Sequence, residues 1–113
     1  HLKDNTNCSI DSFCEMVART AEIMNINNIG IGSDLCLNQP DEVVEWMRNG
    51  TWSKNKNYGE GSKNKPGFPK QPKWFEDARG LENLEKGFKK IGFSDTETNG
   101  ILGNNWYNFY KTI

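Results

Sequence analysis

A short apolar run that ends in a carboxylate places the strongest constraint on what this chain can fold into. The run is Ile-Gly-Ile-Gly-Ser-Asp at residues 29–34, and an amphipathic pattern precedes it directly. The run is too short for another helix, and isoleucines bounded by Asn and Gly are typical of a strand buried on both faces. Open α/β sheets and barrels carry their chemistry at the carboxyl ends of such strands. Asp34 is therefore the leading candidate for a site residue.

The pattern before this run predicts a helix. Ser9 is suited to the N-cap, and apolar residues then recur at i, i+3 and i+4 spacing through residues 10–25. We expect that helix to be followed by one main parallel strand near residues 27–33. Gly30 and Gly32 would let neighbouring groups approach the backbone of the strand closely.

Further helices are predicted downstream. Residues 40–48 and 80–91 carry helical patterns, and a capping box at residues 94–97 starts another helix that Gly103 and Asn104 break or bend. A last turn rich in aromatic residues follows.

A long irregular loop is predicted near residues 51–73. This stretch is rich in Lys, Asn, Gly and Pro. Irregular stretches of this length are usually functional or disordered. Two interpretations of the loop stay open, a cover over a site and a peripheral dimer contact.

Composition and charge exclude several classes of partner. A chain of 113 residues fits one small domain at most, and 14 basic against 15 acidic residues leave a net charge of −1. This balance gives no general attraction to phosphates, and the lysines at residues 54–73 are interpreted as a solvated loop, so nucleic acid is not an expected partner. No apolar run approaches the length of a membrane span. The chain starts without a methionine, so we expect either a trimmed chain or a partial reading frame and leave the compartment open.

The three cysteines do not form a recognisable site. Cys8, Cys14 and Cys36 are odd in number and lack the spacing of zinc or redox motifs, which favours reduced core or helix residues. Cys14 lies on the apolar face of the first helix. A nucleophilic role for Cys14 or Cys36 stays open, although His1 is the only histidine and makes a Cys/His pair unfavourable.

Three pieces of the chain together carry a resemblance to a known family. They are the helix pattern at residues 9–24 with Gly-Ile-Gly-Ser-Asp at 30–34, then Gly-Leu-Glu-Asn-Leu at 80–84 with Gly-Phe-Ser-Asp at 92–95, and finally Ile-Leu-Gly-Asn-Asn-Trp at 101–106. In this order they resemble the carboxyl-terminal part of the membrane (renal) dipeptidase family of zinc peptidases, especially its bacterial dipeptidase-like members. They are similar to the family's penultimate helix and last barrel strand, its late helices and its closing Leu-Gly-Gly-Asn-aromatic pattern.

The resemblance implies a fold and an activity. The fold would be α/β, with residues 1–113 as a single partial domain from the carboxyl-terminal end of a (β/α)8 TIM-type barrel, mostly helical. The family hydrolyses dipeptides with a hydroxide that bridges two zinc ions, and by this likeness Asp34 faces the hydroxide and handles its proton. The metal ligands are expected upstream of His1, which itself matches none of them. The fragment alone is therefore not expected to hold zinc or to be active.

Departures from the family pattern leave alternatives open. Leu-Cys-Leu at residues 35–37 replaces the second Asp-Gly that many members have, which puts the substrate preference in doubt. Asn104 stands where a second closing glycine is common, a mild change because Asn tolerates the left-handed conformation. Without the resemblance, Asp34 is interpreted as a capping or turn residue. The alternative function is a non-catalytic helical module that self-associates, and a homo-oligomer is expected in either case.

Overall fold

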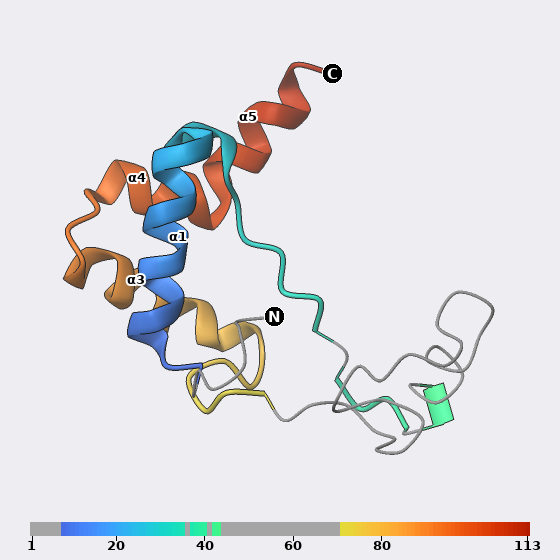
Figure 1. Ribbon diagram of the computed structural model, residues 1–113. Coiled ribbons are helices and arrows are strands. Elements are labelled where there is room, and N and C mark those ends of the chain that lie inside the picture. Colours follow the sequence, from blue (N-terminus) through green and yellow to red (C-terminus); the bar gives the residue numbers. More distant parts are fainter. Residues whose placement is uncertain (1–7, 36, 41, 44–70) are drawn as a thin grey trace, which may run out of the picture. The chain divides into compact units, whose positions relative to one another are not determined.

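The computed structural model describes residues 8–35, 37–40, 42–43 and 71–113 of the chain. The chain divides into two compact units, one made of His1–Asp34 with Pro72–Ile113 and the other of Leu35–Gln71. The described helices of the first unit are α1 (Ile10–Met24), α3 (Leu81–Lys90), α4 (Asp95–Asn99) and α5 (Asn105–Lys111), with short 3-10 turns at Ile26–Asn28 and Ala78–Gly80 (Figure 1).

Little of the second unit is described. Glu42 and Val43 are helical, and the Val43 amide donates to the Pro40 carbonyl at 3.1 Å. The remainder of the helix predicted at residues 40–48 lies outside the described residues, as does the predicted loop up to residue 70.

The helix predicted at residues 10–25 is confirmed. The Ser9 hydroxyl accepts a hydrogen bond from the Ser12 amide at 3.2 Å and so caps the first turn of α1. The helix ends one residue earlier than predicted, because Asn25 adopts a φ of 68° and its side chain accepts from the Asn27 amide at 3.1 Å. Asn tolerates this left-handed conformation better than most residues, so the chain turns here into the 3-10 turn.

The parallel strand predicted near residues 27–33 is wrong. No strand is present in the described part of the chain; residues 26–28 form the 3-10 turn, and the backbone becomes extended at Ile29 (φ −116°, ψ 148°). A strand needs a neighbour for its donors and acceptors, and here the Ile31 amide donates instead to the carbonyl of Ile101 at 3.2 Å. The described fold is therefore mainly helical, which corrects the expected α/β fragment of a TIM-type barrel.

The helix boundaries predicted after residue 80 are confirmed. The chain leaves α3 through Gly92, whose φ of 105° favours glycine. Ser94 and Glu97 form the predicted capping box, in which each side chain accepts from the other's backbone amide, at 3.3 and 2.8 Å. The Glu97 carboxylate accepts from both the amide and the hydroxyl of Ser94, and these two hydrogen bonds hold the pKa of the Glu97 carboxyl below its usual range. Beyond α4, a wide turn at Gly100–Asn104 bends the chain at Gly103, as predicted.

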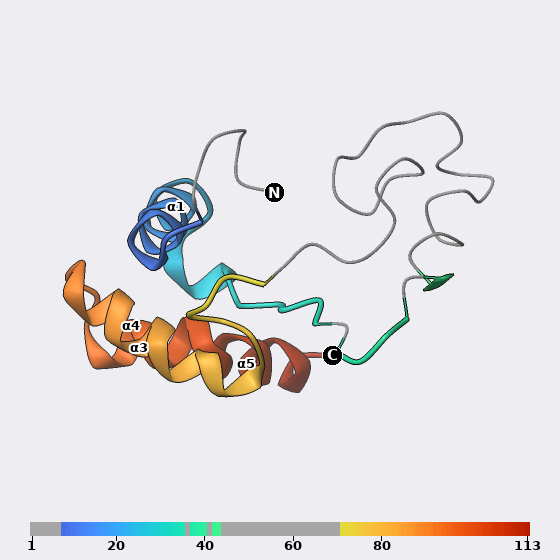
Figure 2. The ribbon, with the colours of Figure 1, turned by 90° about the horizontal axis from the view of Figure 1, so that it is seen from below.

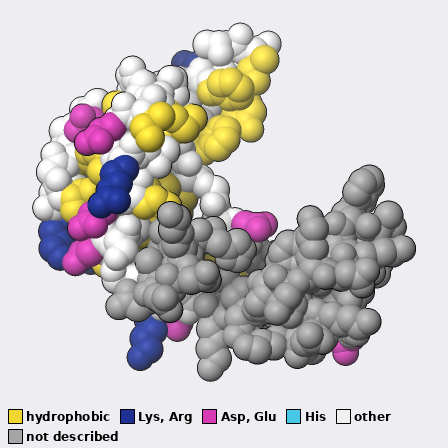
Figure 3. All heavy atoms as spheres, viewed as in Figure 1, with side chains coloured by type: hydrophobic (Ala, Val, Ile, Leu, Met, Phe, Trp, Pro, Cys, Tyr) yellow, Lys and Arg dark blue, Asp and Glu magenta, His cyan; other side chains and the backbone are white. Residues whose placement is uncertain are grey.

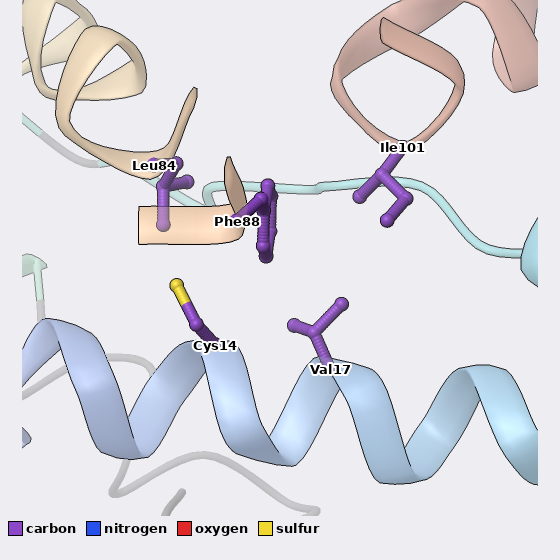
Figure 4. Packing of buried hydrophobic residues seen from close by; sticks show 5 residues of the cluster. All are labelled: Cys14, Val17, Leu84, Phe88 and Ile101. Carbon is purple, nitrogen blue, oxygen red and sulfur yellow. The ribbon is translucent and has the colours of Figure 1, made fainter. Parts of the chain in front are cut away.

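A small core joins α1 to the carboxyl-terminal helices. Figure 2 shows α3, α4 and α5 on one side of this unit and α1 on the other. Figure 4 shows side chains from α1 pointing toward side chains from the opposite layer. The buried residues of this cluster are Cys14, Val17, Leu84, Phe88 and Ile101. An ion pair between Asp11 and Lys90, at 2.8 Å, adds a surface link between α1 and α3.

Cys14 behaves as a core residue. Its side chain is fully buried, and burial raises the pKa of its thiol to about 11. The thiol is therefore protonated at neutral pH, which favours the interpretation of Cys14 as a structural residue. Cys8 is half-buried, and Cys36 lies outside the described residues.

Among the helices in the described part of the chain, none combines the length and the apolar character needed to cross a membrane.

Gly87 allows α1 and α3 to pack closely. A Cβ atom at this position would lie 2.7 Å from the Cys14 sulfur and 3.2 Å from Ile10 Cγ1. We expect overpacking in Gly87→Ala to lower the free energy of unfolding by about 1–3 kcal/mol. The higher helix propensity of Ala offsets up to about 1 kcal/mol of this loss. Urea unfolding followed by circular dichroism measures the change.

A second substitution tests the cause of this loss. Cys14→Ala removes the sulfur that the new methyl group meets, so the double variant should recover part of the loss that Gly87→Ala causes. If the double variant loses as much unfolding free energy as the two single variants together, the two side chains do not compete for the same space.

Candidate functional site

The candidate site lies where the extended segment at residues 29–34 meets residues 101–106. We call residues 101–106 the closing motif. Figure 1 shows the segment leaving the end of α1 beside the start of α5. The Ile31 amide donates to the Ile101 carbonyl at 3.2 Å, and the Trp106 indole nitrogen donates to the Ile31 carbonyl at 3.3 Å. Both polar backbone groups of Ile31 are thus bonded to the closing motif.

Asn105 makes a second connection between the two stretches. Its side-chain nitrogen donates to the carbonyls of Ile26 and Ile29, each at 2.8 Å. An amide nitrogen carries two hydrogens, so both are used. One half-buried side chain therefore ties both ends of the 3-10 turn to the start of α5.

The predicted close approach to the glycines is confirmed at one of them. A Cβ atom on Gly30 would lie 2.4 Å from the Trp106 indole nitrogen, so only glycine lets the ring lie against the backbone as it does. At Gly32 nothing lies within 4 Å of such an atom. The site needs a glycine for packing at residue 30 and not at residue 32.

Hollows border the segment on two sides. One, of about 480 Å³, lies between the segment and α5, with Gly30, Asn105 and Phe109 in its wall. The other, of about 410 Å³, lies between the segment and α1, with Phe13, Met16 and Ile31 in its wall. The lining of both is mostly apolar, which is typical of surface that binds ligands or protein.

Asp34 lies at the exposed end of the segment. Its φ of 49° places it in the left-handed region, which Asp tolerates better than most residues. Among the described residues, no hydrogen bond or ion pair engages its carboxylate.

The described residues do not fit a zinc pair by themselves. Nowhere in the part of the chain that the structure describes do three or more His, Cys, Asp or Glu side chains gather closely enough to hold a metal ion. A two-metal site needs several converging imidazoles and carboxylates. Asp34 stands apart from any such set, and His1 lies outside the described residues. We therefore derive no metal chemistry from this chain's own residues.

Sequence reasoning did not identify the role of Asn105. The residue belongs to the closing pattern that carried the resemblance, but its hydrogen bonds reach carbonyls 76 and 79 residues away. A pairing between distant parts of the chain leaves no periodic signal. The position of Asn105 in that closing pattern was the one signal that pointed to it.

A second feature of this region is an exposed aromatic face on α5. Trp106, Phe109 and Tyr110 are 44%, 56% and 65% exposed, and their spacing places them on one side of the helix. The rings of Trp106 and Tyr110 stack with centroids 6.0 Å apart, and Phe109 meets Tyr110 edge to face at 5.6 Å. Figure 3 shows the resulting hydrophobic patch over α5. Contiguous apolar surface of this kind marks an interaction site in soluble proteins.

Comparisons with protein-family models, curated proteins and solved structures found no match to this chain.

Proposed function

We propose that this chain is the carboxyl-terminal portion of a zinc-dependent dipeptidase, in which Asp34 handles a proton during hydrolysis of the peptide bond. One observation carries the proposal: two of the three motifs that carry the resemblance, at residues 30–34 and 101–106, bond directly to each other. Motifs about 70 residues apart that share a function in a family are expected to meet in space. Asp34 then projects from the end of the segment that the closing motif holds.

The position of Asp34 suits general acid–base chemistry. A carboxylate that transfers protons must be reachable by the reacting group, and Asp34 is exposed. A left-handed backbone at a non-glycine residue is also more frequent at functional positions than elsewhere. Both features are compatible with the acid–base role and also with a turn residue, whereas the helix-capping role lacks support because the carboxylate of Asp34 caps no helix in the described residues.

The proposal places the zinc ligands elsewhere in the enzyme. The described residues contain no set of side chains that holds a metal ion, and the ligands would come from residues that precede His1. The chain alone is then inactive, and the dipeptide binds only where the other part of the enzyme meets the 29–34 segment.

The test is dipeptide hydrolysis by the protein translated from the complete reading frame that contains this chain, beside the 113-residue chain with added zinc. We expect zinc-dependent hydrolysis by the complete protein and none by the chain. The sequence upstream of His1 should also contain a His-x-Asp motif and further histidines. A complete protein that binds no zinc and cleaves no dipeptide would show that the proposal is wrong. Hydrolysis by the chain alone would show that its copies assemble the metal site.

The exposed aromatic face of α5 favours a second candidate function, a non-catalytic module that self-associates. Lys111 is the single charged residue of α5, and its ammonium group lies 4.7 Å from the Tyr107 ring centre on this short helix. The face of Trp106, Phe109 and Tyr110 is uncharged, so a second copy of the same face is a suitable partner. Sedimentation velocity should then show a dimer that Phe109→Ser dissociates and that Ile23→Ser, a change at an exposed residue of α1, leaves intact. A monomer at all concentrations would contradict this candidate.

A further inference from the structure

We propose that Asn105 is a positioning residue that determines where Asp34 lies, an inference that rests on the proposed role of Asp34. Asn105 does not contact Asp34. It acts on the stretch of backbone that leads to Asp34, through the two hydrogen bonds of 2.8 Å to the carbonyls of Ile26 and Ile29.

The stretch that Asn105 holds has little stiffness of its own. It follows a turn at Asn25 and contains Gly30 and Gly32, and glycine gives the backbone more conformational freedom than any other residue. No neighbouring strand fixes it within the described residues. Local hydrogen bonds hold the 3-10 turn itself, and contacts from outside the stretch fix the residues that follow it.

The isoleucines of the stretch pack against the core, and the closing motif adds hydrogen bonds to its backbone. Asn105 bonds the carbonyls on either side of the 3-10 turn, and Ile101 and Trp106 bond the two polar backbone groups of Ile31. Together they fix the register of the segment up to three residues before Asp34. A shift of this register would displace the carboxylate of Asp34, and a displacement of about 1 Å at a catalytic group can cost roughly 100-fold in rate.

The chemistry of the side chain at residue 105 decides whether this link exists. Only a donor can bond two carbonyl oxygens, and an ionised Asp carboxylate of the same size has no donor. Asn105→Asp therefore replaces two attractive contacts by repulsion between oxygens without changing the shape of the side chain. Asn104→Asp is a matched control, because Asn104 is exposed and lies one residue earlier.

The first experiment measures amide hydrogen exchange in the 113-residue chain. We expect Asn105→Asp to speed exchange at Ile31 by about tenfold or more, as expected when a local structural link is lost, while exchange at Leu84 and Phe88 in α3 stays unchanged. Asn104→Asp should change neither. If the charged variant does not fold, Asn105→Ala removes the same donors without adding a charge, and Asn105→Gln, which keeps them, should retain part of the protection. Unchanged exchange at Ile31 in both donorless variants would overturn the inference.

The second experiment separates this inference from the proposed function. In the complete enzyme, we expect Asn105→Asp to lower kcat by roughly 10-fold to 100-fold with KM unchanged, and to cause no further loss when Asp34→Asn is already present. A loss of equal size in both backgrounds would show a general structural role and overturn the inference. Full activity of Asp34→Asn would instead show that the proposed function is wrong, whatever the exchange experiment finds.

Discussion

If the chain belongs to the dipeptidase that we propose, hydrolysis by the complete protein is expected to slow by about 100-fold to 10,000-fold when Asp34 is replaced by Asn, which is the usual contribution of a general acid–base group. Asn has the same size but its amide does not take up a proton at neutral pH. Because the Asp34 side chain is exposed and no described residue bonds it, folding and zinc content should stay the same.

The measurement is kcat and KM on a panel of dipeptides, with the zinc content of each preparation determined beside it. Glu76→Gln is the matched control, since it makes the same carboxylate-to-amide change at another exposed residue of the first unit. A kcat for Asp34→Asn within about twofold of the unchanged enzyme would be too small an effect for an acid–base group and would contradict the role of Asp34.

Phe88→Ala is expected to lower the free energy of unfolding of the chain by about 3–5 kcal/mol. Phe88 is fully buried at the centre of a core that has few other large side chains, and its ring meets Phe93 at 5.7 Å. Truncation removes this packing and leaves a cavity that the helices cannot fill without moving. Since small domains are stable by about 5–15 kcal/mol in total, the variant should be close to unfolded at ambient temperature.

Urea unfolding followed by circular dichroism measures this loss, with Phe109→Ala as the control. Phe109 undergoes the same chemical change but is 56% exposed, so its loss should stay near 0.5 kcal/mol or less, roughly the effect of an ordinary surface substitution. Both are measured at a protein concentration where the chain is monomeric. Equal losses in the two variants would mean that α5 is as well packed as α3.

Local signals in the sequence were enough to predict the helices. They were not enough to decide whether residues 27–33 form a strand, and the strand predicted there is wrong. Ser9, Gly92 and the capping box at residues 94–97 act within one turn of the helices that they bound, so their effect is visible in a few neighbouring residues. A strand is defined by its partner. The isoleucines at residues 29 and 31 indicate an apolar environment, and helices provide it here just as a sheet would.

For the candidate site, the sequence was enough to select residues but not to predict the contact between them. Asp34 follows directly from the order of helix, apolar run and carboxylate, and the closing motif followed from the resemblance. The contact between them did not, because it depends on Asn105 and Trp106 reaching backbone groups of a distant stretch. The left-handed turn at Asn25, which directs the chain toward those donors, also had no clear signal.

The division of the first unit into His1–Asp34 and Pro72–Ile113 has a consequence for how the chain can vary. Its core joins α1 to α3 and Ile101 across the intervening residues 35–71, so folding must bring the two halves together as the ends of a loop. The entropy cost of closing such a loop grows slowly, by about 0.6 kcal/mol for each doubling of its length. Insertions and deletions between the two halves are therefore inexpensive for the closure of this core.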